Sequence, residues 1–207
     1  MSQPMDVIIY TATDLQASQS LLHEIVRAIN LAFTKETALK CTEPRFISDD
    51  QLLSTLGPDG LCAVARSNTG IMASASVVPW QPSSGGVVDW ALRDSRPSDA
   101  ALVDRGLSYE LKAVITANTP ESRGKGLVDL CTNALVSRLK QRHDDPDALL
   151  LWIQLAETEN GAYWHRRGYE QVGPVEMKPK GTWGSENDFR FATSVKRILS
   201  DQSTSHA

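Results

Sequence analysis

Glycine and basic residues alternate in the stretch Pro-Glu-Ser-Arg-Gly-Lys-Gly-Leu at positions 120–127. Glycine allows a ligand to approach the main chain closely, and the arginine and lysine add cations that suit an anion. If a helix begins here, its first N–H groups have no intrahelical partner and carry the positive end of the helix dipole. The stretch therefore predicts a phosphate-binding loop. Its residues are Glu121, Ser122, Arg123, Gly124, Lys125, Gly126 and Leu127.

The segments on either side of this loop have the patterns of a strand and a helix. Positions 109–117 are rich in residues that suit a pleated, half-buried surface, which predicts a strand. Downstream, apolar residues recur at spacings of three and four, which predicts an amphipathic helix over 124–141. These residues are Leu127, Leu130, Cys131, Ala134, Leu135 and Leu139. The glycines then lie at the entrance to the helix.

Spacing excludes two common phosphate-binding motifs. A Walker loop requires Gly-x-x-x-x-Gly-Lys-Ser/Thr, and the dinucleotide fingerprint requires a third glycine three residues after the second. The sequence lacks the Walker spacing and has Asp129 where that third glycine would stand. An ordinary solvated loop with a basic face is the alternative to a phosphate-binding loop.

The loop resembles the acyl-CoA loop of the GCN5-related N-acetyltransferase (GNAT) superfamily, whose pattern is Gln/Arg-x-x-Gly-x-Gly/Ala. Glu121 occupies the first position and departs from this pattern, and Arg123 could supply the cation that is missing there. Positions 159–169 resemble the family's late helix, which ends in Tyr-x-x-x-Gly-Phe. Trp164 stands at the position of that tyrosine, and an indole cannot act as an acid.

The resemblance implies roles for residues around acetyl-CoA as the cosubstrate. Gap-free matching makes Glu110 the base that deprotonates the acceptor amine, with an ion pair to Lys112 or an arginine as the alternative. Tyr163 is the candidate acid for the departing thiolate, with a place in the core as the alternative. The implied acetyl-CoA contacts beyond the loop are the backbone of Val114 and Thr116, an oxyanion-binding N–H of Val114 or Ile115, and Asn160.

The resemblance also implies an α/β fold with a mixed, mostly antiparallel central sheet and flanking helices. Apolar runs and alternation predict strands at 7–10, 61–66, 71–78, 109–117, 148–155, 169–177 and 189–195. Thr13 and Asp14 are the expected caps of a helix that runs to Phe33, and a shorter helix is expected between Ser48 and Gly57. We expect one GNAT-like domain over 6–198, with a polar insertion at 79–108, and a flexible tail over 199–207.

Composition narrows the possible partners. The 207-residue chain has a formal net charge of −4 at pH 7 and no long cluster of lysines or arginines, which disfavours nucleic acid and anionic membranes. Three cysteines, Cys41, Cys62 and Cys131, show no metal-ligand spacing and cannot all pair, which favours a reducing compartment and no metal. The sequence has no signal-peptide pattern and no apolar run of membrane-spanning length, so we expect a cytoplasmic protein.

The implied function is transfer of an acetyl group from acetyl-CoA to a primary amine by direct attack on the thioester. We expect a small metabolite or an amino acid as the acceptor, and a monomer or homodimer as the working form. Two alternatives stay open: a non-catalytic acyl-CoA-binding sensor, and an acetyltransferase for protein lysines or N-termini. Trp80, Trp90 and Trp183 lie in or beside loops, where they could line an acceptor pocket or cover the core.

Overall fold

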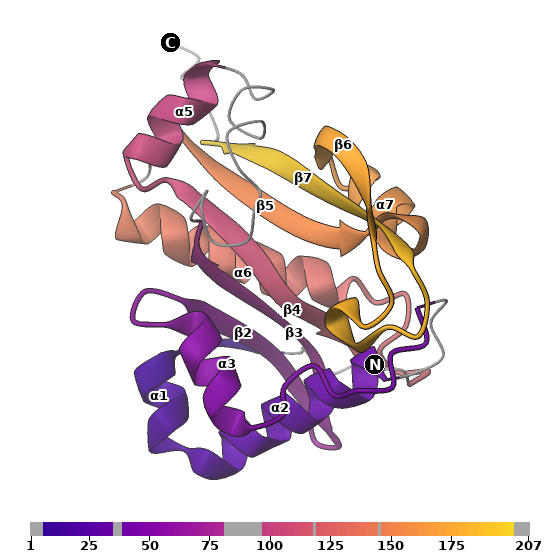
Figure 1. Cartoon of the computed structure of the whole chain (residues 1–207). Coiled ribbons are helices and arrows are strands. Elements are labelled where there is room, and N and C mark those ends of the chain that lie inside the picture. The colour runs from indigo at the N-terminus through magenta and orange to yellow at the C-terminus, as the bar shows by residue number, and fades with distance from the viewer. Residues whose placement is uncertain (1–5, 35–38, 81–96, 118, 145, 201–207) are drawn as a thin grey trace.

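The computed structural model describes residues 6–34, 39–80, 97–117, 119–144 and 146–200, and these residues fold around one seven-stranded sheet. The strands are β1 (Val7–Thr11), β2 (Leu61–Ser67), β3 (Gly70–Pro79), β4 (Ser108–Thr116), β5 (Ala148–Ala156), β6 (Glu170–Lys178) and β7 (Phe189–Leu199). Their spatial order is β1-β2-β3-β4-β5-β7-β6, and all neighbours are antiparallel except β4 and β5 (Figure 1). The predicted mixed, mostly antiparallel sheet is confirmed.

Helices cover both faces of this sheet (Figure 1). The described helices are α1 (Ala12–Ala17), α2 (Gln19–Phe33), α3 (Asp49–Leu56), α5 (Pro97–Asp104), α6 (Leu127–Arg142), α7 (Glu157–His165) and the 3₁₀ helix η1 (Thr182–Gly184). The first three lie against one face and α6 lies against the other. None of the described helices is long and apolar enough to cross a membrane.

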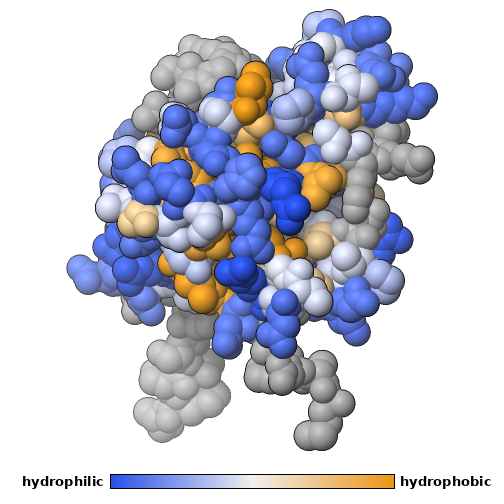
Figure 2. Space-filling model, turned by 90° about the horizontal axis from the view of Figure 1, so that it is seen from below, coloured by the Kyte–Doolittle hydropathy of each residue, from blue (hydrophilic) through white to orange (hydrophobic). Residues whose placement is uncertain are grey.

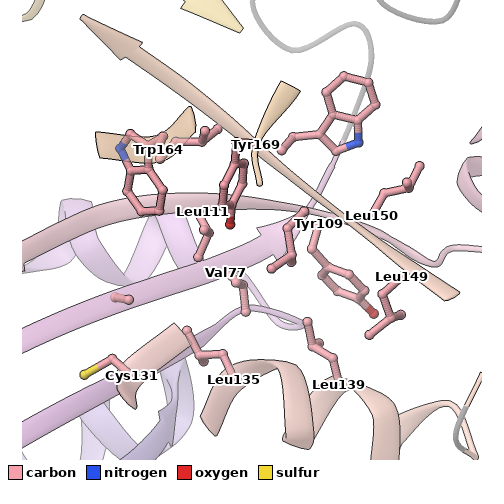
Figure 3. Packing of buried hydrophobic residues seen from close by; sticks show 14 of the residues in the cluster. Val77, Tyr109, Leu111, Cys131, Leu135, Leu139, Leu149, Leu150, Trp164 and Tyr169 are labelled. Atoms are coloured by element: carbon pink, nitrogen blue, oxygen red, sulfur yellow. The ribbon is translucent and has the colours of Figure 1, made fainter. Parts of the chain in front are cut away.

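Alternating side chains along the strands form two apolar cores, one on each face. In β2, Ala63 and Ala65 belong to the core beneath α6, whereas Cys62 and Val64 belong to the core beneath α1, α2 and α3. Figure 3 shows the first core, where Cys131, Leu135 and Leu139 of α6 lie opposite residues of the sheet. Cys131 is fully buried, and burial raises its pKa to about 11, so this thiol is a small core residue.

The N-terminal helix is divided in two. Thr11 caps α1 with its Oγ1, which accepts a hydrogen bond from the Asp14 N–H at 3.2 Å, while the Thr11 N–H donates to the Asp14 carboxylate at 2.8 Å. The chain then leaves the helical conformation at Ser18, before α2 begins. The prediction that Thr13 and Asp14 precede the helix is wrong, because this reciprocal capping pair starts two residues earlier.

The glycine loop lies wholly before α6. Gly124 and Gly126 have φ angles of 68° and 67°, which a right-handed helix cannot contain, so the helix begins at Leu127 rather than at 124. At the C-terminal end, β7 includes Leu199, and the Ser200 N–H donates to a carbonyl at 3.0 Å. The expected tail over 199–207 is therefore wrong at its first residue. Positions 201–207, and 81–96 of the expected insertion, lie outside the described residues.

The two parallel strands pair over only a short distance. Register between β4 and β5 runs for four residue pairs and ends at Leu111 and Ile153. Beyond that point β4 stays paired with β3, and β5 stays paired with β7. Ala113 has a φ of 49° at an irregularity in the β3–β4 register, which bends β4. The strands therefore separate toward their C-terminal ends.

Candidate active site

The separation of β4 and β5 opens a pocket of about 460 Å³. Its walls come from the free edges of both strands, from α7, from the end of α2 with the segment that follows it, and from η1. Predicted site residues that line it are Glu110, Val114, Ile115, Thr116, Asn160 and Tyr163. The loop residues at 121–127 do not line it, but Val128 in the first turn of α6 does. The pocket thus extends toward the glycine loop.

Glu110 lies where β4 and β5 begin to separate, and only 7% of the residue is exposed. Its carboxylate Oε2 lies 3.0 Å from Nζ of Lys112, two residues further along the same face of β4. Both side chains line the pocket. The position suits a base, and the ion pair with Lys112 is also present, so the catalytic role of Glu110 stays a prediction.

Tyr163 of α7 lines the pocket. The residue is half-buried, its ring meets Trp164 edge-on at 5.1 Å, and the Arg167 guanidinium carbon lies 3.6 Å from the ring centre. Burial raises the pKa of Tyr163, so the phenol keeps its proton at neutral pH. Trp164 is buried in the core (Figure 3), so packing explains the tryptophan at the position of the family's tyrosine.

Ser122 holds the glycine loop in shape. It is buried, and its single hydroxyl hydrogen is shared between the carbonyls of Ala117 and Thr119, while its Oγ accepts from the Thr119 N–H. These bonds turn the chain between β4 and α6. The Ser122 hydroxyl is engaged within the loop, and its predicted contact with a ligand stays a prediction.

The N-terminus of α6 is accessible to a ligand. Gly126 is the N-cap residue, and no side chain of the described residues caps the helix. Apart from its two chain neighbours, no atom of the described residues lies within 4 Å of the position that a Cβ would take on Gly124, so a phosphate could reach the main chain there. The Leu127 side chain is buried in the core and leaves its N–H for a ligand. The exposed side chains around this opening are Glu121, Arg123 and Lys125.

A bidentate ion pair neutralises a carboxylate next to this N-terminus. Asp129 lies in the first turn of α6, and Nε and Nη2 of Arg167 donate to its two oxygens at 2.6 and 2.8 Å. An unpaired carboxylate here would repel a phosphate. Sequence reasoning missed Arg167, because its partner is 38 positions away and no local pattern joins them.

The wall of the pocket opposite α7 contains residues that the sequence analysis did not identify as site residues. Phe33, Leu39, Cys41 and Arg45 line it from the end of α2 and the segment after it. The periodic pattern marks Phe33 only as the end of a helix, and no motif marks Leu39, Cys41 or Arg45, because contacts with a distant part of the chain bring these residues to the pocket. Burial and the nearby negative charge of Glu159 raise the pKa of Cys41, so the thiol is protonated and poorly suited to act as a nucleophile.

The three tryptophans near loops have different environments. Trp183 in η1 lines the pocket. Trp80 is buried and stacks on Trp152 with 4.1 Å between ring centres, so it covers the core instead. Trp90 lies outside the described residues. Among the described residues, no group of three or more His, Cys, Asp and Glu side chains is placed to hold a metal ion.

No family model matches the sequence, and no curated protein is similar to it at a significant level. Solved structures do match. An acyl-CoA N-acyltransferase from Pseudomonas aeruginosa has a TM-score of 0.59 at 12% identity, covering 93% of this chain and 99% of its own. FeeM, an N-acyl amino acid synthase from uncultured soil microbes, has a TM-score of 0.54 at 12% identity, covering 93% and 90%.

A GNAT-family acetyltransferase from Staphylococcus aureus has a TM-score of 0.53 at 14% identity, covering 92% of this chain and 98% of its own. The similarity in each case extends over nearly the whole of both chains, although few residues are identical. The resemblance inferred from the loop and the late helix is thus confirmed for the fold. The chain has the fold of the GCN5-related N-acetyltransferase superfamily.

Proposed function

We propose that the protein transfers an acetyl group from acetyl-CoA to a primary amine, in the cytoplasm and as a monomer or homodimer. The main support is the pocket between the separated strands β4 and β5, which extends toward an uncapped helix N-terminus bordered by two glycines. Structural neighbours include an acyl-CoA N-acyltransferase and an N-acyl amino acid synthase, which agrees with acyl transfer to nitrogen. The three cysteines are free and buried, which agrees with a reducing compartment.

The loop and the free strand edges would hold the two parts of the cosubstrate. The main chain at Gly124, Gly126 and Leu127 would bind the pyrophosphate, because the first N–H groups of α6 have no intrahelical partner. Exposed Arg123 and Lys125 would add charge attraction. The linear thiol-bearing arm would lie between the strands, against the backbone of 114–116 and beside Asn160.

In the chemical step, Glu110 accepts a proton from the ammonium form of the acceptor, because only the free amine can attack. The amine nitrogen bonds to the thioester carbonyl carbon, and a backbone N–H of Val114 or Ile115 stabilises the oxyanion. The carbon–sulfur bond then breaks, and Tyr163 donates its proton to the thiolate, to be reprotonated from solvent. The nitrogen loses its second proton to solvent, and Glu110 releases to solvent the proton that it accepted, so the products are an acetamide, free CoA and one net proton.

The test is calorimetric titration with acetyl-CoA and with CoA, followed by thiol release in the same samples with a panel of amines, amino acids and basic peptides. Binding with turnover supports the proposal and gives the class of acceptor. Binding without turnover on any acceptor favours an acyl-CoA sensor. Absence of binding overturns the proposal, whatever the acceptor.

A further inference from the structure

Arg45 is a cation on the wall of the pocket opposite α7. The residue is partly buried, and its guanidinium carbon lies 5.6 Å from the Trp183 ring centre, 5.8 Å from that of Phe33 and 6.0 Å from that of Phe46. Aromatic faces attract a guanidinium at these distances. The three rings therefore surround the charge without neutralising it.

Among the described residues, no carboxylate forms an ion pair with Arg45. Lys112, the other cation that lines the pocket, is paired with Glu110 at 3.0 Å. Burial lowers the pKa of Arg45, and the negative charge of Glu110 is the largest influence in the opposite direction. A guanidinium still stays charged at neutral pH, so a bound anion would compensate the cost of its burial.

The surroundings of Arg45 hold it in place. The Asn30 side chain of α2 donates to the Phe46 carbonyl at 2.8 Å and accepts from the Phe46 N–H at 2.9 Å, which fixes the residue next to Arg45. On the other side, the Thr42 N–H donates to the Gly184 carbonyl at 3.2 Å. The wall is thus tied both to α2 and to η1.

The turn that contains Trp183 is tightly constrained as well. Trp183 has a φ of 57°, in the left-handed region that a bulky residue rarely adopts. A Cβ on the adjacent Gly184 would lie 2.9 Å from the Glu43 Cβ, so this turn packs closely against the segment that carries Arg45. Strain at a residue that lines a pocket agrees with a binding role for its side chain.

Arg45 and Glu110 line the same pocket, whereas residues 121–127 of the glycine loop do not line it. The charge of Glu110 acts on Arg45, and Thr116, where β4 ends before the glycine loop, is six residues beyond Glu110. Six residues of a strand span about 20 Å. The pocket therefore combines the Arg45 cation with the Glu110 carboxylate, which complements a ligand with one negative and one positive group. A second carboxylate that lines the pocket, Glu159, accepts a hydrogen bond from the Leu39 N–H at 2.6 Å.

We infer that the acceptor amine also carries a carboxylate, as an amino acid does, and that Arg45 binds this carboxylate while Glu110 receives the amine. This inference rests on the proposed function. Acetyl transfer itself is unchanged, since the amine nitrogen forms the new bond and CoA leaves. Arg45 would thus determine which amines are used, by contact with a part of the substrate that does not react.

The experiment compares matched acceptors that differ in the carboxylate alone: phenylalanine with phenethylamine, and lysine with cadaverine, each also as the amino acid amide. Thiol release is measured at saturating acetyl-CoA. For whichever of phenylalanine and lysine is the better acceptor, we expect kcat/KM at least about 10-fold higher than for its amine and amide counterparts, which lack the carboxylate, as a charge-assisted bidentate contact implies. Equal or better use of the amines and amides would overturn the inference and leave the acetyltransferase proposal intact.

Arg45→Met should raise KM for the carboxylated acceptor about 10-fold or more and change KM for the acceptors without a carboxylate by less than about twofold. Arg45→Lys keeps the charge but not the planar fork. Its KM for the carboxylated acceptor should therefore lie between that of the unmodified protein and that of Arg45→Met. Arg66→Met is the matched control, because Arg66 pairs with Glu24 at 2.6 Å and does not line the pocket. Arg66→Met should leave KM unchanged for both kinds of acceptor.

Calorimetry with CoA separates the inference from the proposal on which it rests. Arg45→Met should bind CoA as the unmodified protein does. An equal loss of kcat/KM with acceptors that carry a carboxylate and with acceptors that lack one, at unchanged CoA affinity, would show that Arg45 only supports the fold of the wall. A protein that binds no acetyl-CoA and acetylates no acceptor would overturn the proposed function and this inference together.

Discussion

The two ends of the pocket are built for binding by different means. At the α6 end, one continuous stretch turns through Gly124 and Gly126 and leaves main-chain N–H groups accessible. At the end that we propose for the acceptor, separate segments meet, and the side chains of Arg45, Glu110 and Trp183 line the pocket. A main-chain site depends on space and backbone conformation, whereas a side-chain site depends on the identity of each residue. The kind of substitution that impairs binding or activity should therefore differ between the two ends.

The largest effect is expected at the acceptor end. Glu110→Gln keeps the shape of the side chain but removes the base, so kcat should fall about 100-fold or more while CoA affinity is unchanged. The deficit should shrink as pH rises, because more of the amine is then unprotonated in solution. Steady-state thiol release between pH 6 and 9 measures both effects.

Lys112→Met is the control for that substitution, because it breaks the same 3.0 Å ion pair and leaves the carboxylate in place. If Lys112→Met lowers kcat as much as Glu110→Gln, the pair is structural and Glu110 is not the base.

At the loop end, filling the space should matter most. Gly124→Glu places a charged side chain at a φ of 68° over the open N-terminus of α6, and should weaken acetyl-CoA binding about 100-fold by calorimetry. Gly106→Glu is the matched control, since Gly106 has a φ of 70° and equally open space around its Cβ position but lies before β4. Similar losses of affinity in both variants would mean that strain, and not a phosphate site, explains the effect.

The ion pair between Arg167 and Asp129 tests how the two ends are linked. Arg167→Met leaves the Asp129 carboxylate unpaired beside the N-terminus of α6, and should weaken CoA binding about 10-fold. Adding Asp129→Asn removes that charge and should restore most of the affinity. If the double variant binds as weakly as Arg167→Met, the guanidinium contributes by direct contact or by packing on Tyr163.

The smallest effect is expected for a loop side chain. Lys125→Met removes one exposed cation and leaves the main chain unchanged, so CoA affinity should fall only about two- to fivefold. The loss should shrink further as salt is added, because exposed charges are screened. Titrations at 20 and 300 mM salt measure this, and a loss as large as that of Gly124→Glu would contradict a main-chain site.

The difference between a site formed by one stretch of chain and a site formed by separate segments also explains what could be predicted from the sequence. The strands, α6 and the loop were predictable, because period, β-branched runs and glycines act within a few neighbouring residues. The position of Glu110 in the pocket followed from the family pattern, since its distance from the loop is fixed along a single strand. These features depend on one stretch of chain.

The wall of the pocket opposite α7 and the break between α1 and α2 were not predictable from the sequence. The chain turns at Ser18 without a glycine or proline to mark the break. Arg45 and Trp183 meet only after α2, η1 and the segments beside them have packed together. Such contacts between distant residues leave no periodic trace, so a single sequence does not reveal them.

The short pairing of β4 and β5 leaves the sheet incomplete at its centre. Beyond Leu111 and Ile153 each strand keeps the partner on its outer side, and no strand of the described residues pairs with its inner side. Backbone groups along such edges favour an extended partner. An amide-containing arm bound there would replace the missing ladder, much as an added strand does. Ligand binding would then also be the last step of sheet formation, and a saturating ligand would make the folded state harder to unfold.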